Sequence, residues 1–133
     1  MNPPVSPVHV AFVSYLGIEL VEQSAERARS TLNVLPEFLN SWGVAHGGVI
    51  MTMLDYAMSA SVRGRCGADR SVLTVDISVA FMNAGRGKRV DAEGRVMHAG
   101  RSTFFCEAEA RDEAGIRLAK AMGTFKLVPE KRG

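Results

Sequence analysis

Residues 49–67, with the sequence VIMTMLDYAMSASVRGRCG, limit more than any other segment how this chain can fold. Apolar side chains occur on nearly every side of the segment, without the alternation of a strand, and it is too long for one strand. A helix of about four turns that is apolar all round has to be buried, because an exposed helix keeps a polar face. Gly64 and Gly67 are expected to end it as C-cap glycines. The rest of the chain must therefore cover one long helix.

Segments with strand periodicity lie on both sides of this helix. Two precede it, residues 18–23 and 27–35, and Pro36 ends the second. Four further segments follow the helix, and in each of them apolar and polar residues alternate: residues 73–81, 89–98, 103–110 and 116–128. Turns at residues 85–87, 99–100 and 113–115 separate these segments. In the first of these the alternation predicts one buried face, made of Leu73, Val75, Ile77, Val79 and Phe81.

This order of elements predicts an α+β fold in which an antiparallel sheet of five to six strands curls around one long central helix. A single sheet can bury a helix on all sides only if the sheet curls around it. A second subunit could bury the remaining side of the helix, and we expect both a curled sheet and a second subunit. The chain of 133 residues is below the roughly 150 residues of a typical domain, which predicts a single domain over 1–133.

The two ends of the chain are expected to contribute little to this domain. Pro3, Pro4 and Pro7 disfavour regular structure, which predicts a loose arm over residues 1–7, and residues 129–133 form a tail. A short helix is expected between Ser6 and Tyr15, with one apolar side made of Val8, Phe12 and Tyr15.

Composition and charge exclude several classes of protein. A hydrophobic content of 47% with 23% charged residues is typical of a globular domain and excludes a disordered, collagen-like or coiled-coil chain. The net charge of +2 is too small to indicate a nucleic-acid-binding face. No apolar run approaches the roughly 20 residues of a membrane-spanning helix, and the start does not resemble a signal peptide. Cys66 and Cys106 belong to no CxxC motif, which predicts two reduced thiols in a cytoplasmic protein, with a lone disulfide as the alternative.

Asp55 is the candidate for chemistry, because it lies between Leu54 and Tyr56 in the apolar helix. A carboxylate in such a place costs free energy unless it is hydrogen-bonded or paired. An acid kept there can serve as a general base or a nucleophile. The alternative is a structural aspartate that bonds to a nearby backbone group or hydroxyl.

His46, Gly47 and Gly48 open the same helix. Glycines there let a ligand approach the backbone, and the free N–H groups suit a developing oxyanion, although a tight turn capped by His46 is the simpler alternative. The nine residues from His46 to Asp55 correspond to about 13.5 Å of rise and about 900° of rotation, which are nearly opposite faces. If both ends act in catalysis, Gly47 and Asp55 must meet across a two-fold interface. The spacing thus links an enzymatic function to at least a dimer.

Residues 40–57, NSWGVAHGGVIMTMLDYA, resemble the active-site signature of hotdog-fold acyl-CoA thioesterases. Within that family they are most similar to the phenylacetyl-CoA thioesterase (PaaI-like) branch, in which Asn, Gly, HGG and a helical Asp recur at this spacing. Residues 74–84, TVDISVAFMNA, are similar to the strand that follows the helix in that family. The resemblance covers roughly residues 10–128 and implies a hotdog fold that hydrolyses an acyl-CoA thioester.

The resemblance also implies a role for each candidate residue. Asp55 would activate a water molecule or attack the thioester carbonyl itself, and the Gly47 N–H would polarise the carbonyl oxygen. Asn40 would help place the water or the substrate, and His46 would orient the loop as a neutral or hydrogen-bonded group. Thr74 falls where the family often has a serine or threonine near the water, but it lies on the polar face of its strand and needs a bulge to turn it toward the site.

Coenzyme A is implied as the leaving group, a part of the substrate, and the resemblance implies no resident cofactor. His9, His46 and His98 lack metal-ligand spacing, so we expect no metal site. Phosphates of coenzyme A need cations at the mouth of the site, with scattered solvated charges as the alternative. The candidates for binding substrate or coenzyme A are Gly48, Lys88, Arg89, His98, Gly100 and Arg101.

We therefore expect a homo-oligomer that is at least a dimer, with active sites shared between subunits. Of the possible assemblies we favour a homotetramer built as a dimer of dimers. One competing function is a hotdog acyl-thioester dehydratase or hydratase, against which the opposite faces of His46 and Asp55 argue. The other is a non-catalytic acyl-CoA-binding protein, which has no reason to bury Asp55 beside a thioester. The sequence leaves open whether the acyl group is aryl, medium or long, and whether Asp55 is a base or a nucleophile.

Overall fold

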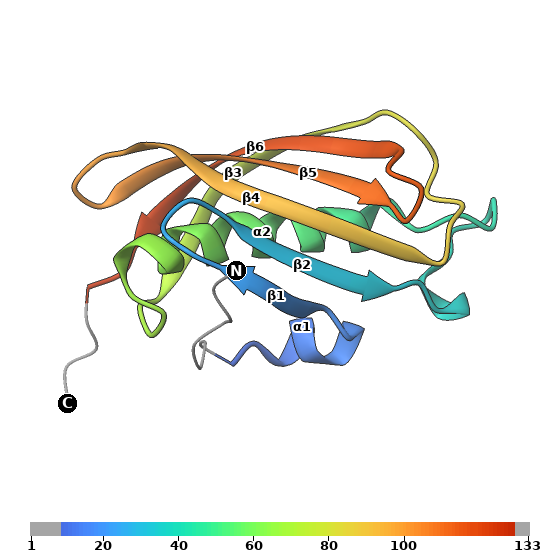
Figure 1. Ribbon diagram of the computed structural model, residues 1–133, viewed down its shortest axis with the longest axis horizontal. Coiled ribbons are helices and arrows are strands. Elements are labelled where there is room, and N and C mark those ends of the chain that lie inside the picture. Colours follow the sequence, from blue (N-terminus) through green and yellow to red (C-terminus); the bar gives the residue numbers. More distant parts are fainter. Residues whose placement is uncertain (1–8, 130–133) are drawn as a thin grey trace.

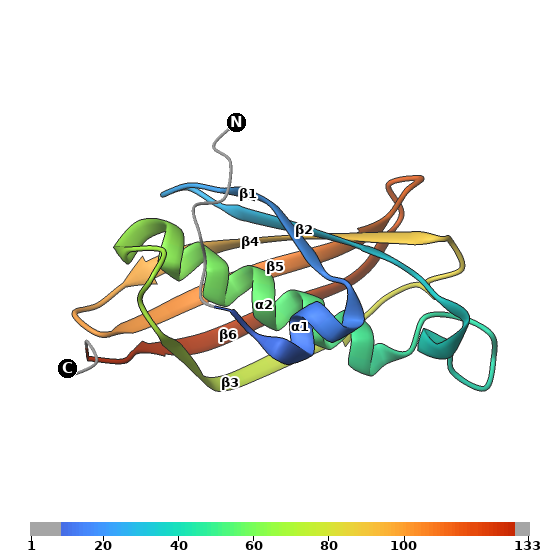
Figure 2. The same cartoon turned by 90° about the horizontal axis from the view of Figure 1, so that it is seen from below.

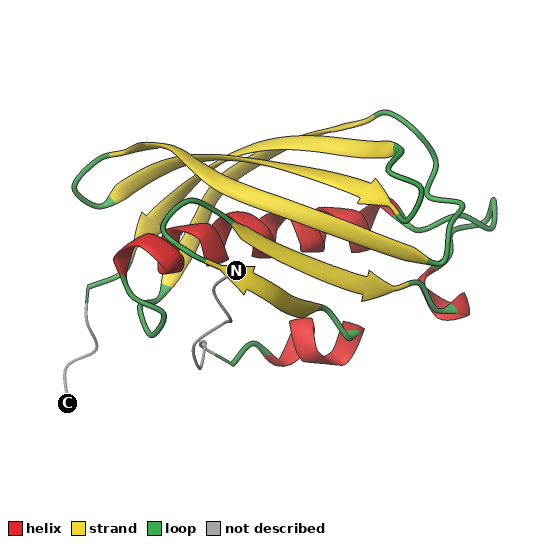
Figure 3. Cartoon of the chain, viewed as in Figure 1, coloured by secondary structure: helices red, strands yellow, loops and turns green. Residues whose placement is uncertain are grey.

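Six strands form one antiparallel sheet in the order β1-β2-β4-β5-β6-β3 in the computed structural model, which describes residues 9–129 (Figure 1). One long helix, α2 (Gly47–Cys66), lies in the curl of this sheet (Figure 3). The strands are β1 (Glu19–Gln23), β2 (Ala28–Asn33), β3 (Val72–Phe81), β4 (Arg89–Ala99), β5 (Thr103–Asp112) and β6 (Arg117–Leu127). The predicted architecture is confirmed. The predicted arm, residues 1–7, and residues 130–133 of the predicted tail lie outside the described residues.

The core lies between α2 and the inner face of the sheet. Helix and sheet come closest where β4 crosses α2, because Gly94 has no side chain: a Cβ there would lie 2.6 Å from the carbonyl carbon of Ala57. Alternate residues of the central strands point to the helix and are buried, as their alternation predicts. They include Val90, Ala92, Phe104, Cys106, Ala108 and Ala110.

The end of α2 differs from the prediction at one of its two glycines. Gly67 is the C-cap, with φ 136°. Gly64 lies inside the helix, so the prediction that it ends the helix is wrong. A Cβ on Gly64 would lie 2.2 Å from the carbonyl oxygen of Ser24, and the glycine therefore lets the turn between β1 and β2 pack directly on the helix.

The sheet leaves one side of α2 open. Met51, Thr52, Asp55 and Ser59 are only partly covered or exposed, whereas the sides of the helix that face the sheet are fully buried. A short helix, α1 (Ala11–Leu16), lies over this open side (Figure 2). Residues 9–129 therefore do not enclose the helix on all sides.

Helix α1 packs with a different side from the predicted one, turned by about 100° around the helix axis. Val13 and Leu16 are buried, while Phe12 and Tyr15 are 57% and 83% exposed. Gly17 ends the helix in the left-handed conformation, with φ 82°, and leads directly into β1, so this connection determines which side of α1 meets the core. The predicted partner residue Val8 lies outside the described residues.

Strand β3 lies at an edge of the sheet and contains a bulge, where its register against β6 shifts between Thr74 and Asp76. A bulge moves all following side chains to the other face. Leu73 and Val75 are each 61% exposed, so their predicted place in the core is wrong, whereas Ile77 and Val79, beyond the bulge, are half-buried.

Two further predictions concern the state of the cysteines and the presence of a membrane-spanning helix. Cys66 and Cys106 are both free thiols. Across residues 9–129, no helix has the length and apolarity needed to cross a lipid bilayer.

Candidate active site

Asp55 and Thr74 meet on the open side of α2. The Thr74 hydroxyl donates a hydrogen bond of 2.6 Å to Oδ1 of Asp55. The bulge in β3 provides this contact, because it turns Thr74 toward the helix instead of leaving it on the outer face of the strand. Among the described residues, no group bonds to Oδ2 of Asp55. One carboxylate oxygen is thus fixed and the other is available.

Both residues line a groove of about 370 Å³ between α1, α2 and the start of β3. Asp55 is half-buried in its wall, so the carboxylate is less enclosed than its place in an apolar helix predicts. The groove has apolar walls with a few polar groups, which is typical of a site for a small organic ligand. Its other lining residues are Val10, Phe12, Val13, Thr52, Tyr56, Ser59, Arg63, Arg70, Ser71, Val72 and Leu73.

The first turn of α2 leaves one backbone donor unused. His46 is the N-cap, and its Nδ1 accepts a hydrogen bond of 2.8 Å from the Gly48 N–H. The N–H groups of Val49 and Ile50 donate to the His46 carbonyl oxygen, at 3.0 and 3.3 Å. Within residues 9–129 the Gly47 N–H has no acceptor. It can therefore donate to a ligand at the positive end of the helix dipole.

These contacts bear on the predicted roles of His46 and Gly48, which stay predictions. His46 accepts at Nδ1 and so holds the loop in place, as an orienting residue does. Gly48, predicted to bind substrate, has its N–H occupied by His46. Phe81 lies against Gly47: a Cβ on this glycine would be 3.3 Å from Cζ of the phenyl ring.

Asn40 shapes the loop that leads into α2. Its Oδ1 accepts hydrogen bonds from the backbone N–H groups of Trp42 and Val44, at 2.9 and 3.3 Å, and its own N–H donates to the Val44 carbonyl oxygen at 2.8 Å. The side-chain oxygen is therefore used within the loop. The predicted contact of Asn40 with water or substrate remains a prediction for its amide nitrogen.

The two chemical groups of α2 are far apart within one chain. Gly47 and Asp55 are eight residues apart, which corresponds to about 12 Å of helix rise. A single reacting carbonyl cannot contact both groups of the same helix.

Comparison with known proteins gives the family. The model of the Thioesterase superfamily matches residues 43–119, a stretch that includes the helix start, Asp55 and Thr74. The chain belongs to the thioesterase superfamily. It is a thioester hydrolase, and the family predicted from residues 40–57 is confirmed.

Individual proteins of known name or structure agree with this family. The medium/long-chain acyl-CoA thioesterase YigI of Escherichia coli strain K12 is 26% identical over 134 residues, covering 90% of this chain and 86% of YigI. The conserved protein PA5202 from Pseudomonas aeruginosa superposes with a TM-score of 0.85 at 28% identity, covering 90% of this thioesterase and 95% of PA5202. The PaaI protein from the E. coli phenylacetic acid degradation operon shares the fold, with a TM-score of 0.83 at 19% identity, covering 92% and 88% of the two chains.

The cationic group predicted to hold coenzyme A is not one group in a single chain of this thioesterase. Lys88 and Arg89 lie at the start of β4, whereas His98, Gly100 and Arg101 lie at its far end. The ten steps of strand between Arg89 and Ala99 span roughly 33 Å. The predicted single cluster is wrong within one chain, because the two turns that supply these residues are at opposite ends of the same extended strand. The contact of each residue with coenzyme A stays a prediction. Arg89 is moreover paired with Asp91 at 3.1 Å.

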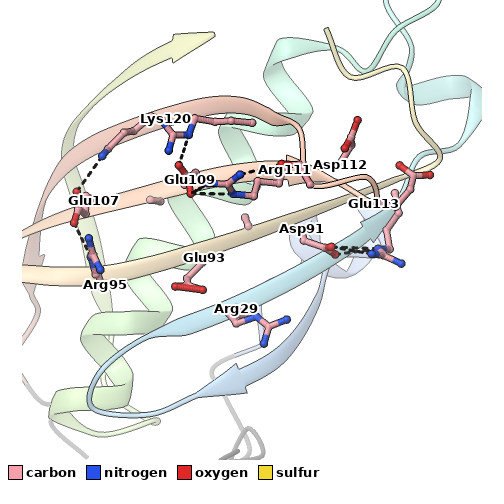
Figure 4. Close-up of a pocket in the computed structure, with 15 residues that line it drawn as sticks. Arg29, Asp91, Glu93, Arg95, Glu107, Glu109, Arg111, Asp112, Glu113 and Lys120 are labelled. Carbon is pink, nitrogen blue, oxygen red and sulfur yellow. Dashed lines mark hydrogen bonds and ion pairs between the residues drawn. The ribbon is translucent and has the colours of Figure 1, made fainter. Parts of the chain in front are cut away.

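A hollow of about 530 Å³ lies on the outer face of the thioesterase sheet, away from α2 (Figure 4). Its six basic and six acidic side chains cancel in charge. They form ion pairs across the strands: Glu107 accepts from Arg95 at 2.6 Å and lies 3.5 Å from Lys120. The hydrogen bond from Arg95 holds the pKa of Glu107 below its ordinary value. With its charges balanced, this hollow offers no net positive charge to an anion.

Among the groove residues that sequence reasoning missed is Arg63. Arg63 lies two helical turns beyond Asp55, at the end of an apolar helix where an arginine is ordinarily solvated. In the structure it is only 4% exposed and lines the groove. The signal available in the sequence is its spacing, because Asp55, Ser59 and Arg63 follow one another at intervals of four and share one side of the helix.

Proposed function

We propose that this thioesterase hydrolyses an acyl-CoA to the free acid and coenzyme A, in a site that two subunits share. The observation that supports this is the hydrogen bond from Thr74 to Asp55 in the groove, which fixes one carboxylate oxygen and leaves the other free. The thioester carbonyl lies beside Asp55, with the acyl group in the groove and the coenzyme at its mouth. Coenzyme A enters and leaves with each turnover and is not a resident cofactor.

In the proposed reaction Asp55 acts as a general base. Its Oδ2 takes a proton from a water molecule while the water oxygen bonds to the carbonyl carbon. The carbonyl oxygen becomes an oxyanion and accepts a hydrogen bond from the Gly47 N–H of the second subunit. The tetrahedral intermediate then breaks its C–S bond, and the departing thiolate takes the proton from Asp55. Each turnover consumes one water molecule and restores the carboxylate.

Direct attack by Asp55 on the carbonyl carbon is the competing route, through a mixed anhydride that water then cleaves. A single turnover in water enriched in oxygen-18 separates the two routes. Attack by water places the label in the released acid, which is the expected result. Attack by the carboxylate leaves the acid unlabelled in this first turnover when water cleaves the anhydride at the Asp55 carbonyl, and the label then appears in Asp55.

A two-fold dimer brings the separated groups together. Among the residues that the structure describes, β3 is an edge strand with no neighbour on its outer side. The exposed apolar side chains Leu73, Val75, Phe81 and Met82 lie along and just beyond it. Because an exposed apolar edge invites pairing with another strand, we propose that β3 forms the dimer interface, with a homotetramer as a dimer of such dimers.

The acyl group and the compartment are proposed from a named relative and from the two cysteines. YigI is named for medium- and long-chain acyl-CoA, and residues 40–57 resemble the PaaI-like branch, so we propose an acyl or aryl-acetyl group of moderate size. The two free thiols support a reducing compartment, and we propose the cytoplasm.

A hydrolysis assay over a panel of acyl-CoA thioesters, with free thiol as the readout, tests this proposal. Wild-type protein is expected to release thiol, and Asp55→Asn is expected to lose most of the activity while it stays folded. Asp76→Asn, an exposed aspartate just beyond the bulge, is the matched control and should keep the activity. Undiminished turnover in folded Asp55→Asn would contradict the mechanism. Binding or dehydration without thiol release would favour the competing functions.

A further inference from the structure

Arg63 is a buried cation with no ion-pair partner among residues 9–129. Its side chain lies in the wall of the groove and is only 4% exposed. Nε and Nη2 are buried, and neither has a hydrogen-bond acceptor among the described residues. Such groups are rare in folded proteins, because an unpaired buried donor loses its hydration and gains nothing in return.

The surroundings of Arg63 provide no negative charge within residues 9–129. The phenol ring of Tyr56 lies beneath the guanidinium, whose carbon is 5.7 Å from the ring centroid. Burial lowers the pKa of the guanidinium, and Tyr56 only partly offsets this effect. Asp55 is the one carboxylate that lines the groove, and it bonds to Thr74 instead. A charge that is buried without a counter-ion indicates that a ligand supplies one.

The groove extends from Asp55 toward this cation. Asp55 and Arg63 are eight residues apart on one side of α2, about 12 Å along the helix axis. Helical side chains lean toward the N-terminus, and the contact of Arg63 with Tyr56 shows that its guanidinium does so. Ser59 lies between the two charges. Arg70 also lines the groove; its Nη2 donates to the Val128 carbonyl oxygen at 3.3 Å, and its buried Nε has no acceptor in the described part of the chain.

We propose that this end of the groove binds a carboxylate at the far end of the acyl group, so that the enzyme prefers an ω-carboxyacyl thioester. The inference rests on the proposed function, because it assumes that the thioester lies at Asp55. A guanidinium binds a carboxylate through two parallel hydrogen bonds, and here it does so where water is largely excluded. Arg63 is then a specificity-determining residue, and the products are a dicarboxylic acid and free coenzyme A.

Adipyl-CoA and heptanoyl-CoA test the preference, because the two acyl groups have similar length and differ in the terminal charge. We expect wild-type protein to favour adipyl-CoA in kcat/KM by about ten- to hundredfold. Arg63→Met should remove this preference, mainly through KM, since the carboxylate is bound equally before and during the reaction. Hydrolysis of heptanoyl-CoA should change little. Arg63→Lys should keep part of the preference.

The matched control is Arg65→Met, an exposed arginine in the same last turn of α2. It should keep the full preference. Arg63→Met is expected to fold, because removing an unpaired buried charge often stabilises a protein, and its unfolding midpoint should be at or above that of the wild type. Equal kcat/KM values of the wild-type enzyme for heptanoyl-CoA and adipyl-CoA would overturn the inference and leave the proposed function intact.

Calorimetric binding of two amides gives a readout that does not depend on hydrolysis, because a neutral amide takes the place of the thioester in both. Adipic acid monoamide keeps the terminal carboxylate and heptanamide has none. The monoamide should bind to wild-type protein at least tenfold more tightly than heptanamide, and Arg63→Met should abolish the difference. Selective binding of the monoamide without any thioester hydrolysis would support the carboxylate site while the proposed function failed. Equal binding of both amides, or binding of neither, would overturn the inference, since another group would then satisfy Arg63.

Discussion

The hydroxyl of Thr74 on β3 donates a hydrogen bond of 2.6 Å to Oδ1 of Asp55 on α2. The contact exists because the bulge between Thr74 and Asp76 turns the threonine toward the helix. It holds Oδ1 of the carboxylate and leaves Oδ2 without a hydrogen bond among the described residues. The hydrogen bond thus connects a local irregularity of an edge strand with the aspartate proposed as the catalytic base.

Replacing Thr74 by valine is expected to slow thioester hydrolysis with little effect on folding. Valine has the same shape but cannot donate a hydrogen bond to the carboxylate. A hydrogen bond to a charged group contributes about 1.5–3 kcal/mol, so kcat should fall by about ten- to a hundredfold. The side chain is exposed, and the unfolding midpoint should change little. Thr74→Ser should keep most of the activity, and unaltered kcat in Thr74→Val would show that the contact is only structural.

Replacing Gly47 by proline removes the N–H of the first helical turn that has no acceptor within residues 9–129. Proline is well accommodated at this position, and the extended ψ of His46, 136°, suits a residue before proline. Loss of an oxyanion donor should reduce kcat by about a hundred- to a thousandfold. Gly47→Ala is the matched control, because it introduces the same Cβ contact with Phe81 but keeps the N–H. Equal losses in the two variants would assign the effect to that contact instead.

The two cysteines should differ sharply in reactivity. Burial raises the pKa of the Cys106 thiol to about 11, although a hydrogen bond with Ser61 partly opposes this. Cys66 is only half-buried at the end of α2. At pH 8 a colorimetric thiol reagent should titrate one thiol in the native protein and the second only after unfolding. Cys66→Ala should remove the fast reaction, and equally fast reaction of both thiols would contradict the packing of the core.

Glu22 should make the stability depend on pH in the acid range. Its side chain is 8% exposed, and hydrogen bonds and charge from Arg27, together with Arg29, hold the pKa of this carboxyl below its ordinary value of 4.5. A lowered pKa in the folded state stabilises the protein above about pH 4.5, and this contribution is lost as the pH falls through the folded-state pKa.

Glu22→Gln tests this dependence by urea unfolding. At pH 7 the variant should be less stable than the wild type by about 1–2 kcal/mol, and the difference should shrink between pH 5 and pH 3. Glu19→Gln, on the same strand but exposed, is the control and should follow the wild type. A difference that stays constant across this range would show that the ion pairs with Glu22 do not stabilise the fold.

The central strands could be predicted well from the sequence because one face of each packs against α2. In β4 and β5 the alternation continues along the strand, and Val90, Ala92, Cys106 and Ala108 are buried as predicted. In β3 the bulge inserts a residue that has no signature in the sequence, and every side chain before it is on the face opposite to the prediction. Because apolar residues occur on both faces of this edge strand, the sequence does not show where the alternation of inward and outward side chains shifts by one residue.

The candidate site could be predicted in part for a similar reason. Asp55 and Gly47 are conspicuous because a carboxylate interrupts an apolar helix and paired glycines open it. The grouping of Lys88 with Arg101 failed, since turns that are near in sequence lie at opposite ends of β4. Arg63 was missed because an arginine near a helix end resembles a solvated charge, and only the packing of α1 and β3 shows that it is buried.

The central claim is that Asp55 of one subunit and the Gly47 N–H of another act on the same thioester. Mixing Asp55→Asn with Gly47→Pro subunits tests it most directly, with subunit exchange verified by mass spectrometry of the intact assemblies. Random pairing makes half of the dimers mixed, and one of the two sites in each mixed dimer has both wild-type groups. The account predicts recovery of about a quarter of the wild-type rate per site, from two variants that are each inactive alone. No recovery after complete exchange would contradict the shared site.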